Sequence, residues 1–93
     1  MAIQSFACRD TERFFAGQAV ARFANIAKVL SRKLQQLDGA VTLEFLKAPP
    51  GKRLEALQGD RAGQHSIRIN DQYRICFVWM DPGPRNVEVT DYH

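Results

Sequence analysis

The feature that most constrains the fold of this chain is a change of hydrophobic period on either side of one loop. Before the loop, apolar residues recur at spacings of three and four, the pattern of an amphipathic helix. After it, apolar and polar residues alternate, the pattern of half-buried strands. The loop itself is Pro49-Pro50-Gly51, whose residues favour turns over helix or strand. The sequence therefore predicts helices first and a sheet second.

The clearest predicted helix runs from Ala21 to Leu37. Its apolar side consists of Phe23, Ile26, Ala27, Leu30, Leu34 and Leu37, and its opposite face carries Arg22, Lys28, Arg32, Lys33 and Gln35. Solvation is the simplest role for that basic face. Asp38-Gly39 should end the helix, and a further short helical turn is expected in residues 41–48.

Ahead of this helix, residues 2–7 are predicted to form a short first strand, with Asp10 or Thr11 capping a second helical segment. Four strands are expected after the loop: RLEALQ, HSIRIN, YRICFVW and NVEVTD. Asn70-Asp71 and residues 81–84 separate the last three as tight turns. The predicted fold class is α+β, a compact domain with N-terminal helices packed on one face of a twisted antiparallel sheet.

The size and composition favour a single globular domain covering residues 1–93. Lys and Arg number 13 against 10 Asp and Glu, and the formal charge of +3 favours an anionic partner such as nucleic acid without demanding one. The sequence contains no apolar run long enough to span a bilayer and no basic leader followed by an apolar core, so we expect a cytoplasmic protein. Cys8 and Cys76 are expected to be reduced, and their spacing predicts no metal site.

Arg74 stands out because it lies in the middle of a very apolar strand. A cation there costs desolvation free energy unless an anion compensates it. That anion is either a neighbouring carboxylate, which would make Arg74 structural, or the phosphate of a ligand. The turn with Asp60 and Arg61 is predicted to be a tight polar cap, since the lysine and hydroxyl spacing of a phosphate-binding loop is missing.

The chain ends on Asp91, Tyr92 and His93, three side chains that often move protons or bind phosphate. Chain ends usually fray, so simple exposure is the alternative. If the last strand pairs with the hairpin before it, these residues lie near Arg74. A base, an acid and a cation in one place suit cleavage of a phosphodiester by its internal 2′-hydroxyl. The other histidine, His65, opens a strand and is expected more often as a packing residue than as a catalyst.

The stretch PPGKRLEALQGDRAGQHSIRINDQYRICFVW, followed by VEVTDYH, resembles the HigB (GraT-like) branch of the RelE toxin superfamily. The resemblance covers most of the chain and is densest from Pro49 to His93. It implies ribosome-dependent endonucleolytic cleavage of mRNA without a metal or other cofactor. It also implies a type II toxin-antitoxin system, in which a HigA-type helix-turn-helix antitoxin neutralises the toxin and links it to operator DNA.

By position, Arg74 matches the phosphate-binding arginine of the family, and Asp91, Tyr92 and His93 match its functional C-terminal residues. These four are the candidate catalytic residues. The implied binding partners are the 70S ribosome and mRNA, with no membrane involved. The candidate RNA-binding residues are Lys52, Arg53, Glu55, His65 and Arg68.

At one place the sequence departs from some relatives, which carry His-x-x-Lys where this chain has Glu55 and Gln58. The identity of the general base is therefore open, and Glu55 is either a substitute base or a solvated carboxylate. Two other functions remain as alternatives. The protein could inhibit by occupying the ribosome or RNA without cleaving it, or it could act only with its antitoxin as a co-repressor.

Overall fold

The structure, a computed structural model, describes residues 3–47 and 54–91. Helices precede strands along the chain, as the change of period predicts. The helical part consists of α1 (Arg9–Phe15), the 3-10 helix η1 (Ala21–Ile26), α2 (Ala27–Gly39) and the 3-10 helix η2 (Leu43–Lys47). The part that follows consists of β1 (Glu55–Ala56), the 3-10 helix η3 (Gly59–Arg61), β2 (His65–Arg68), β3 (Tyr73–Met80) and β4 (Gly83–Asp91). The predicted α+β class is confirmed.

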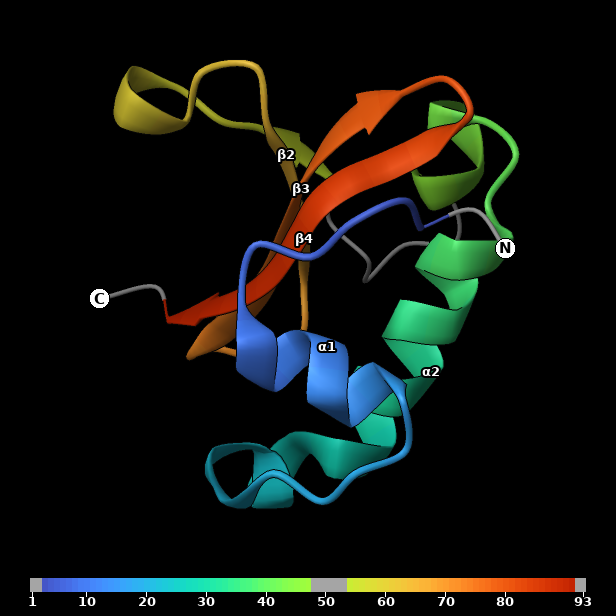
Figure 1. Cartoon of the computed structure of the whole chain (residues 1–93). Coiled ribbons are helices and arrows are strands. Elements are labelled where there is room, and N and C mark those ends of the chain that lie inside the picture. The colour runs from blue at the N-terminus through green and yellow to red at the C-terminus, as the bar shows by residue number, and fades with distance from the viewer. Residues whose placement is uncertain (1–2, 48–53, 92–93) are drawn as a thin grey trace.

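The four strands form one sheet in the order β1-β2-β3-β4, and every neighbouring pair is antiparallel. The turn between β2 and β3 is held by Asn70, whose Oδ1 accepts hydrogen bonds from the backbone N–H groups of Gln72 and Tyr73 at 2.8 and 2.7 Å. A short polar side chain that bonds to the backbone two residues ahead is the usual reason for Asn in such turns. β3 and β4, the two longest strands, pair as a hairpin that runs through the middle of the molecule (Figure 1).

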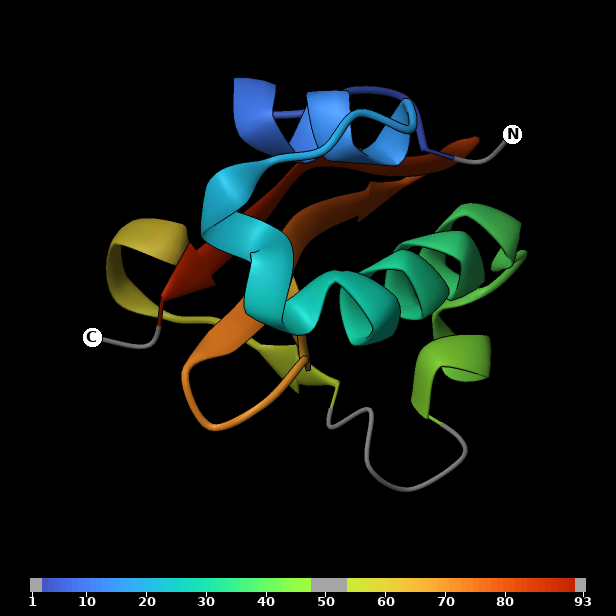
Figure 2. The ribbon, with the colours of Figure 1, turned by 90° about the horizontal axis from the view of Figure 1, so that it is seen from below.

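The core lies between the sheet and the helices. In both views α2 is on one side of the sheet and the loop with η3 is on the other (Figures 1 and 2). The helical segments contribute buried apolar side chains at spacings of three and four, and the strands contribute them at every second position. The largest fully buried members are Phe23, Leu30, Leu34 and Leu37 from the helices and Ile67, Ile75, Phe77 and Val87 from the strands.

The segment predicted as one helix divides into η1 and α2 at Ala27. Phe23 and Ile26, both buried, are three residues apart, and a 3-10 helix places such residues on one side. Leu30, Leu34 and Leu37 then follow the wider α-helical spacing. The predicted basic face is wrong at Lys33, which is only 9% exposed and lies on the core side of α2.

The predicted first strand is also wrong over residues 3–7, the part of it that the structure describes, which make only an isolated parallel bridge, Phe6 to Val87. Backbone bonds tie Gln4 to Pro84, Ser5 to Val87 and Ala7 to Val87. A regular ladder cannot continue because Pro84 has no N–H to donate. The segment lies along β4 in Figure 1 without becoming a strand.

Thr11 does not cap α1, which begins at Arg9 with Cys8 at the N-cap position. Instead Thr11 is fully buried, and its Oγ1 accepts the backbone N–H of Val89 at 3.1 Å. Together with the N-terminal segment, α1 therefore covers the outer edge of β4. Within residues 3–47 and 54–91, no helix has the length and apolar character needed to cross a membrane.

Candidate functional site

The side chains that could carry chemistry gather on the face of the sheet turned away from the helices. Residues opposite one another in an antiparallel pair share a face. Register places Arg68 opposite Arg74 and Arg74 opposite Thr90 in one row across β2, β3 and β4. The next row is Glu55, Ser66, Cys76 and Glu88. We call these two rows the polar face.

The first row brings two arginines into direct opposition. Like charges at opposed positions destabilise a sheet unless anions offset them. Arg68 forms an ion pair with Asp71, in the turn that follows β2. Arg74 is half-buried, and its Nε donates to Thr90 Oγ1 at 3.4 Å. The arrangement concentrates positive charge at one end of the polar face, where an anion such as phosphate would be stabilised.

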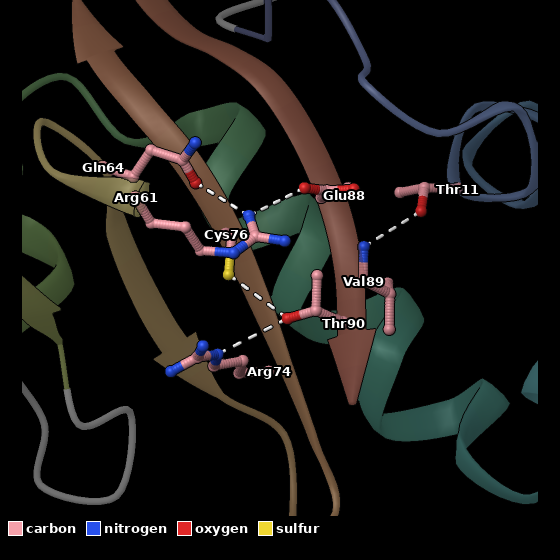
Figure 3. A network of polar contacts seen from close by, with 8 residues as sticks. All are labelled: Thr11, Arg61, Gln64, Arg74, Cys76, Glu88, Val89 and Thr90. Carbon is pink, nitrogen blue, oxygen red and sulfur yellow. Dashed lines mark hydrogen bonds and ion pairs between the residues drawn. The ribbon is translucent and has the colours of Figure 1, made fainter. Parts of the chain in front are cut away.

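Thr90 connects the two rows. Its hydroxyl oxygen also lies 3.3 Å from Sγ of Cys76, a residue with no exposed surface. Bonds on both sides restrict the threonine rotamer, which β-branching already limits. Figure 3 shows the guanidinium of Arg74 anchored through Nε, with its terminal nitrogens on the side away from Thr90.

The second row ends in an ion pair that spans the sheet. From η3, Nη1 of Arg61 donates to Glu88 Oε1 at 2.8 Å and to Gln64 Oε1 at 3.0 Å. The hydrogen bond to Glu88 raises the pKa of Arg61 above its ordinary value, against a smaller lowering from burial. The predicted tight turn is present as η3, but the side chain of Arg61 extends beyond the turn to reach Glu88 on β4. In Figure 3 the side chain of Arg61 extends from this loop past Cys76 to reach Glu88.

The structure brings the predicted site residues only partly together. Asp91 is opposite Tyr73, one position beyond the Arg74–Thr90 pair, so alternation sends its side chain to the other face. It is exposed, and its Oδ2 accepts a bond from Nε2 of Gln72 at 3.1 Å. Four predicted site residues lie outside the described part of the chain: Lys52, Arg53, Tyr92 and His93.

His65 does not join the polar face. It lies opposite Phe77, and the two rings stack with centroids 6.2 Å apart and planes 24° apart. Its buried Nδ1 has no hydrogen-bond partner among the described residues. This placement fits the packing role that the sequence favoured. Glu55 is exposed at the edge of the polar face, opposite Ser66.

Three neighbours of the candidate catalytic residues were not singled out from the sequence: Arg61, Glu88 and Thr90. Alternation along the last strand does place Glu88 and Thr90 on one face, which was a usable signal. No local signal pairs Arg61 with a carboxylate 27 residues away. Within residues 3–47 and 54–91, His, Cys, Asp and Glu side chains form no group of three that could hold a metal ion.

Comparison with known proteins gives consistent matches. Residues 4–93 match the family described as the RelE-like toxin of type II toxin-antitoxin system HigB. Toxin HigB-1 of Vibrio cholerae is 47% identical over 58 residues, 62% of this chain and 61% of that protein. An uncharacterized protein of Haemophilus influenzae is 37% identical over 64 residues, 69% of this chain and 63% of that protein. The matched regions thus span about three fifths of these relatives.

Among solved structures, the YoeB-YefM complex from Staphylococcus aureus contains a similar chain. The TM-score is 0.62 with 17% sequence identity, over 100% of this chain and 99% of the other. At that identity the likeness concerns the fold alone.

Proposed function

This chain belongs to the HigB-like family of RelE-like toxins of type II toxin-antitoxin systems, and from that membership we propose that it inhibits translation by cleaving mRNA on the ribosome. The observation that carries the proposal is the position of Arg74. The residue is half-buried in a central strand, opposite a second arginine, and oriented by Thr90. A guanidinium held in this way is suited to bind a phosphate through two parallel hydrogen bonds.

The proposed reaction is transfer of the phosphoryl group to the neighbouring 2′-hydroxyl of the RNA. A base removes the 2′ proton, the oxygen attacks phosphorus, and the 5′-oxygen of the next nucleotide leaves with a proton from an acid. Arg74 stabilises the charge that grows on the phosphate oxygens in the transition state. Tyr92 and His93 are proposed to supply the proton transfers, and no metal takes part. Asp91 is the weaker candidate, because its side chain is directed to the other face of the sheet.

We propose that the ribosome is needed because it holds the RNA in the reactive geometry. Positioning of the reacting groups alone can supply several kcal/mol of a barrier, on the order of 7–11 in favourable cases. Lys52, Arg53, Glu55 and Arg68 are proposed to contact RNA around Arg74. His65 stays a weaker candidate for such contact, given its position against Phe77.

The proposed partner is an antitoxin made alongside the toxin. The YoeB-YefM complex from Staphylococcus aureus, which contains a chain of the same fold, joins two proteins. For this chain we propose a HigA-type helix-turn-helix antitoxin, through which the toxin would reach operator DNA. The site of action is the cytoplasm, where mRNA is translated.

Growth assays with mapped RNA ends test the proposal. Arg74→Ala should abolish growth inhibition and the new mRNA ends while leaving the protein folded, because it removes the phosphate-binding cation.

Removing His93 should lower the cleavage rate by roughly a hundredfold, the usual size of a proton-transfer contribution. Growth inhibition without new mRNA ends would instead favour a toxin that occupies the ribosome without cleavage.

A further inference from the structure

We propose that Arg61 is a positioning residue, which holds Glu88 so that this carboxylate does not compete with RNA phosphate for Arg74. The inference rests on the proposed function, because it assigns a role in preparing the same site. Arg61 lies in the η3 turn and not in the row that contains Arg74.

Glu88 is within reach of Arg74 by the geometry of the sheet. Arg74 is opposite Thr90, and Glu88 precedes Thr90 by two positions on the same face of β4. Such a diagonal neighbour has its Cα about 7–8 Å away, a separation that two long side chains can close. An ion pair between them would place a carboxylate where the substrate phosphate has to bind.

In the structure, the carboxylate of Glu88 is directed toward Arg61 of η3 and not toward Arg74. It accepts a hydrogen bond of 2.8 Å from Arg61, and the two side chains are 24% and 34% exposed. Partial burial makes this pair stronger than a fully solvated one, because water screens it less. Gln64 bonds to the same Nη1 at 3.0 Å and so fixes the arginine from within its own loop.

A second ion pair serves the other arginine of the row. Arg68 is bound to Asp71, whose side chain is fully exposed, and the pair joins residues three apart. Such a solvated local pair is weak and opens readily. Glu88, two positions from Thr90 on the same face of β4, is thus engaged more firmly than Asp71, the carboxylate that pairs with Arg68.

The test compares Arg61→Gln, Glu88→Gln and the double variant. In cleavage of mRNA on programmed ribosomes, Arg61→Gln should raise KM by roughly three- to tenfold and change kcat by less than about twofold, since the released carboxylate competes with substrate binding. Adding Glu88→Gln should restore KM to near the parental value. Glu88→Gln alone should cleave like the parent, because an amide does not compete as an anion.

A spectroscopic readout on the toxin alone separates this inference from the proposed function. The Nε–H resonance of Arg74 should shift in Arg61→Gln and return in the double variant. If Arg74→Ala is inactive but the double variant stays as impaired as Arg61→Gln, Arg61 itself contacts RNA and the inference is wrong. If Arg74→Ala cleaves normally, the proposed function fails, while the resonance still reports whether Glu88 moves.

The same set of variants also provides a comparison that does not need a stable Arg61→Gln protein. Should Arg61→Gln be too unstable to purify, Glu88→Gln is compared with the double variant, which has no unpaired carboxylate at this position. Equal KM values for these two support the inference. A higher KM in the double variant overturns it, since Arg61 would then matter without Glu88 present.

Discussion

At the residue scale, the ability of Arg74 to bind a phosphate depends on the charges and contacts of its neighbours. Arg68 opposes it, Thr90 bonds to its Nε, and Glu88 is bound by Arg61. Because the folded state raises the pKa of Arg61, the free energy contributed by its charge is fully present below the ordinary arginine pKa and is lost only as pH rises past the folded value. Arg61 should therefore keep this arrangement intact throughout the neutral and mildly alkaline range.

His65 offers a sharp test of packing against RNA contact. Its ring stacks on Phe77, and its buried Nδ1 has no partner among the described residues, so a phenyl ring should fit in its place. His65→Phe should change the free energy of unfolding by no more than about 1 kcal/mol and should retain toxicity. Thermal unfolding and growth assays measure the two effects.

The matched control for this substitution is His65→Ala, which loses the ring and should be the less stable variant of the two. A folded His65→Phe protein that no longer inhibits growth would show that the imidazole has a functional role.

The sequence alone identified Arg74 as a candidate because a cation in an apolar strand is conspicuous. It did not reach Arg61, because its partner lies across the sheet.

At the element scale, the bend in β4 aligns both halves of the strand with their neighbours. Register shifts between Cys76 and Val78, and Asn86 lies at the shift with a φ of 54°. Ser5 supports the bend, as its Oγ accepts the backbone N–H of Asn86 at 2.9 Å. Between the pairs Cys76–Glu88 and Val78–Arg85, β3 advances by two residues and β4 by three. The extra residue in β4 is a bulge, and it keeps Glu88 and Thr90 on the polar face.

A β-branched residue at position 86 should be costly. Asn86→Val should lower the free energy of unfolding by about 1–2 kcal/mol, because valine is strained at positive φ. Asn86→Gly is the matched control, which loses the same side-chain contact to Ser5 without the strain. Chemical denaturation of both variants measures the difference, and equal stability would mean that the bulge does not require the left-handed conformation.

The elements were predictable to the extent that they depend on local pattern. The helix around Leu30 and the strand around Ile75 each carry a clear period, and both exist. Residues 2–7 also look strand-like, but their pairing fails where Pro84 and the bulge interrupt the neighbouring strand. Lys33 was misplaced because period alone cannot tell a solvated lysine from one buried at the margin of the core.

At the scale of the whole molecule, the helices build a core on one side of the sheet, and the polar face lies on its other side. Figure 2 shows the helices gathered on one side of the strands. The formal charge of +3 favours approach to an RNA-rich particle, while the proposed reaction depends on a few side chains. Fold and family follow from sequence and comparison together. The acid and base cannot be assigned by pattern, because they depend on where the last residues lie relative to bound RNA.

We expect this chain to cleave mRNA only while the ribosome holds the RNA. The most direct measurement incubates purified toxin with one labelled mRNA, either free or bound to programmed ribosomes, and analyses the ends produced. We expect cleavage only with ribosomes, leaving a 5′-hydroxyl and a 2′,3′-cyclic or 3′-phosphate, as attack by the 2′-hydroxyl requires. Arg74→Ala should yield no product. Efficient cleavage of free RNA, or products with 5′-phosphate ends, would contradict the claim.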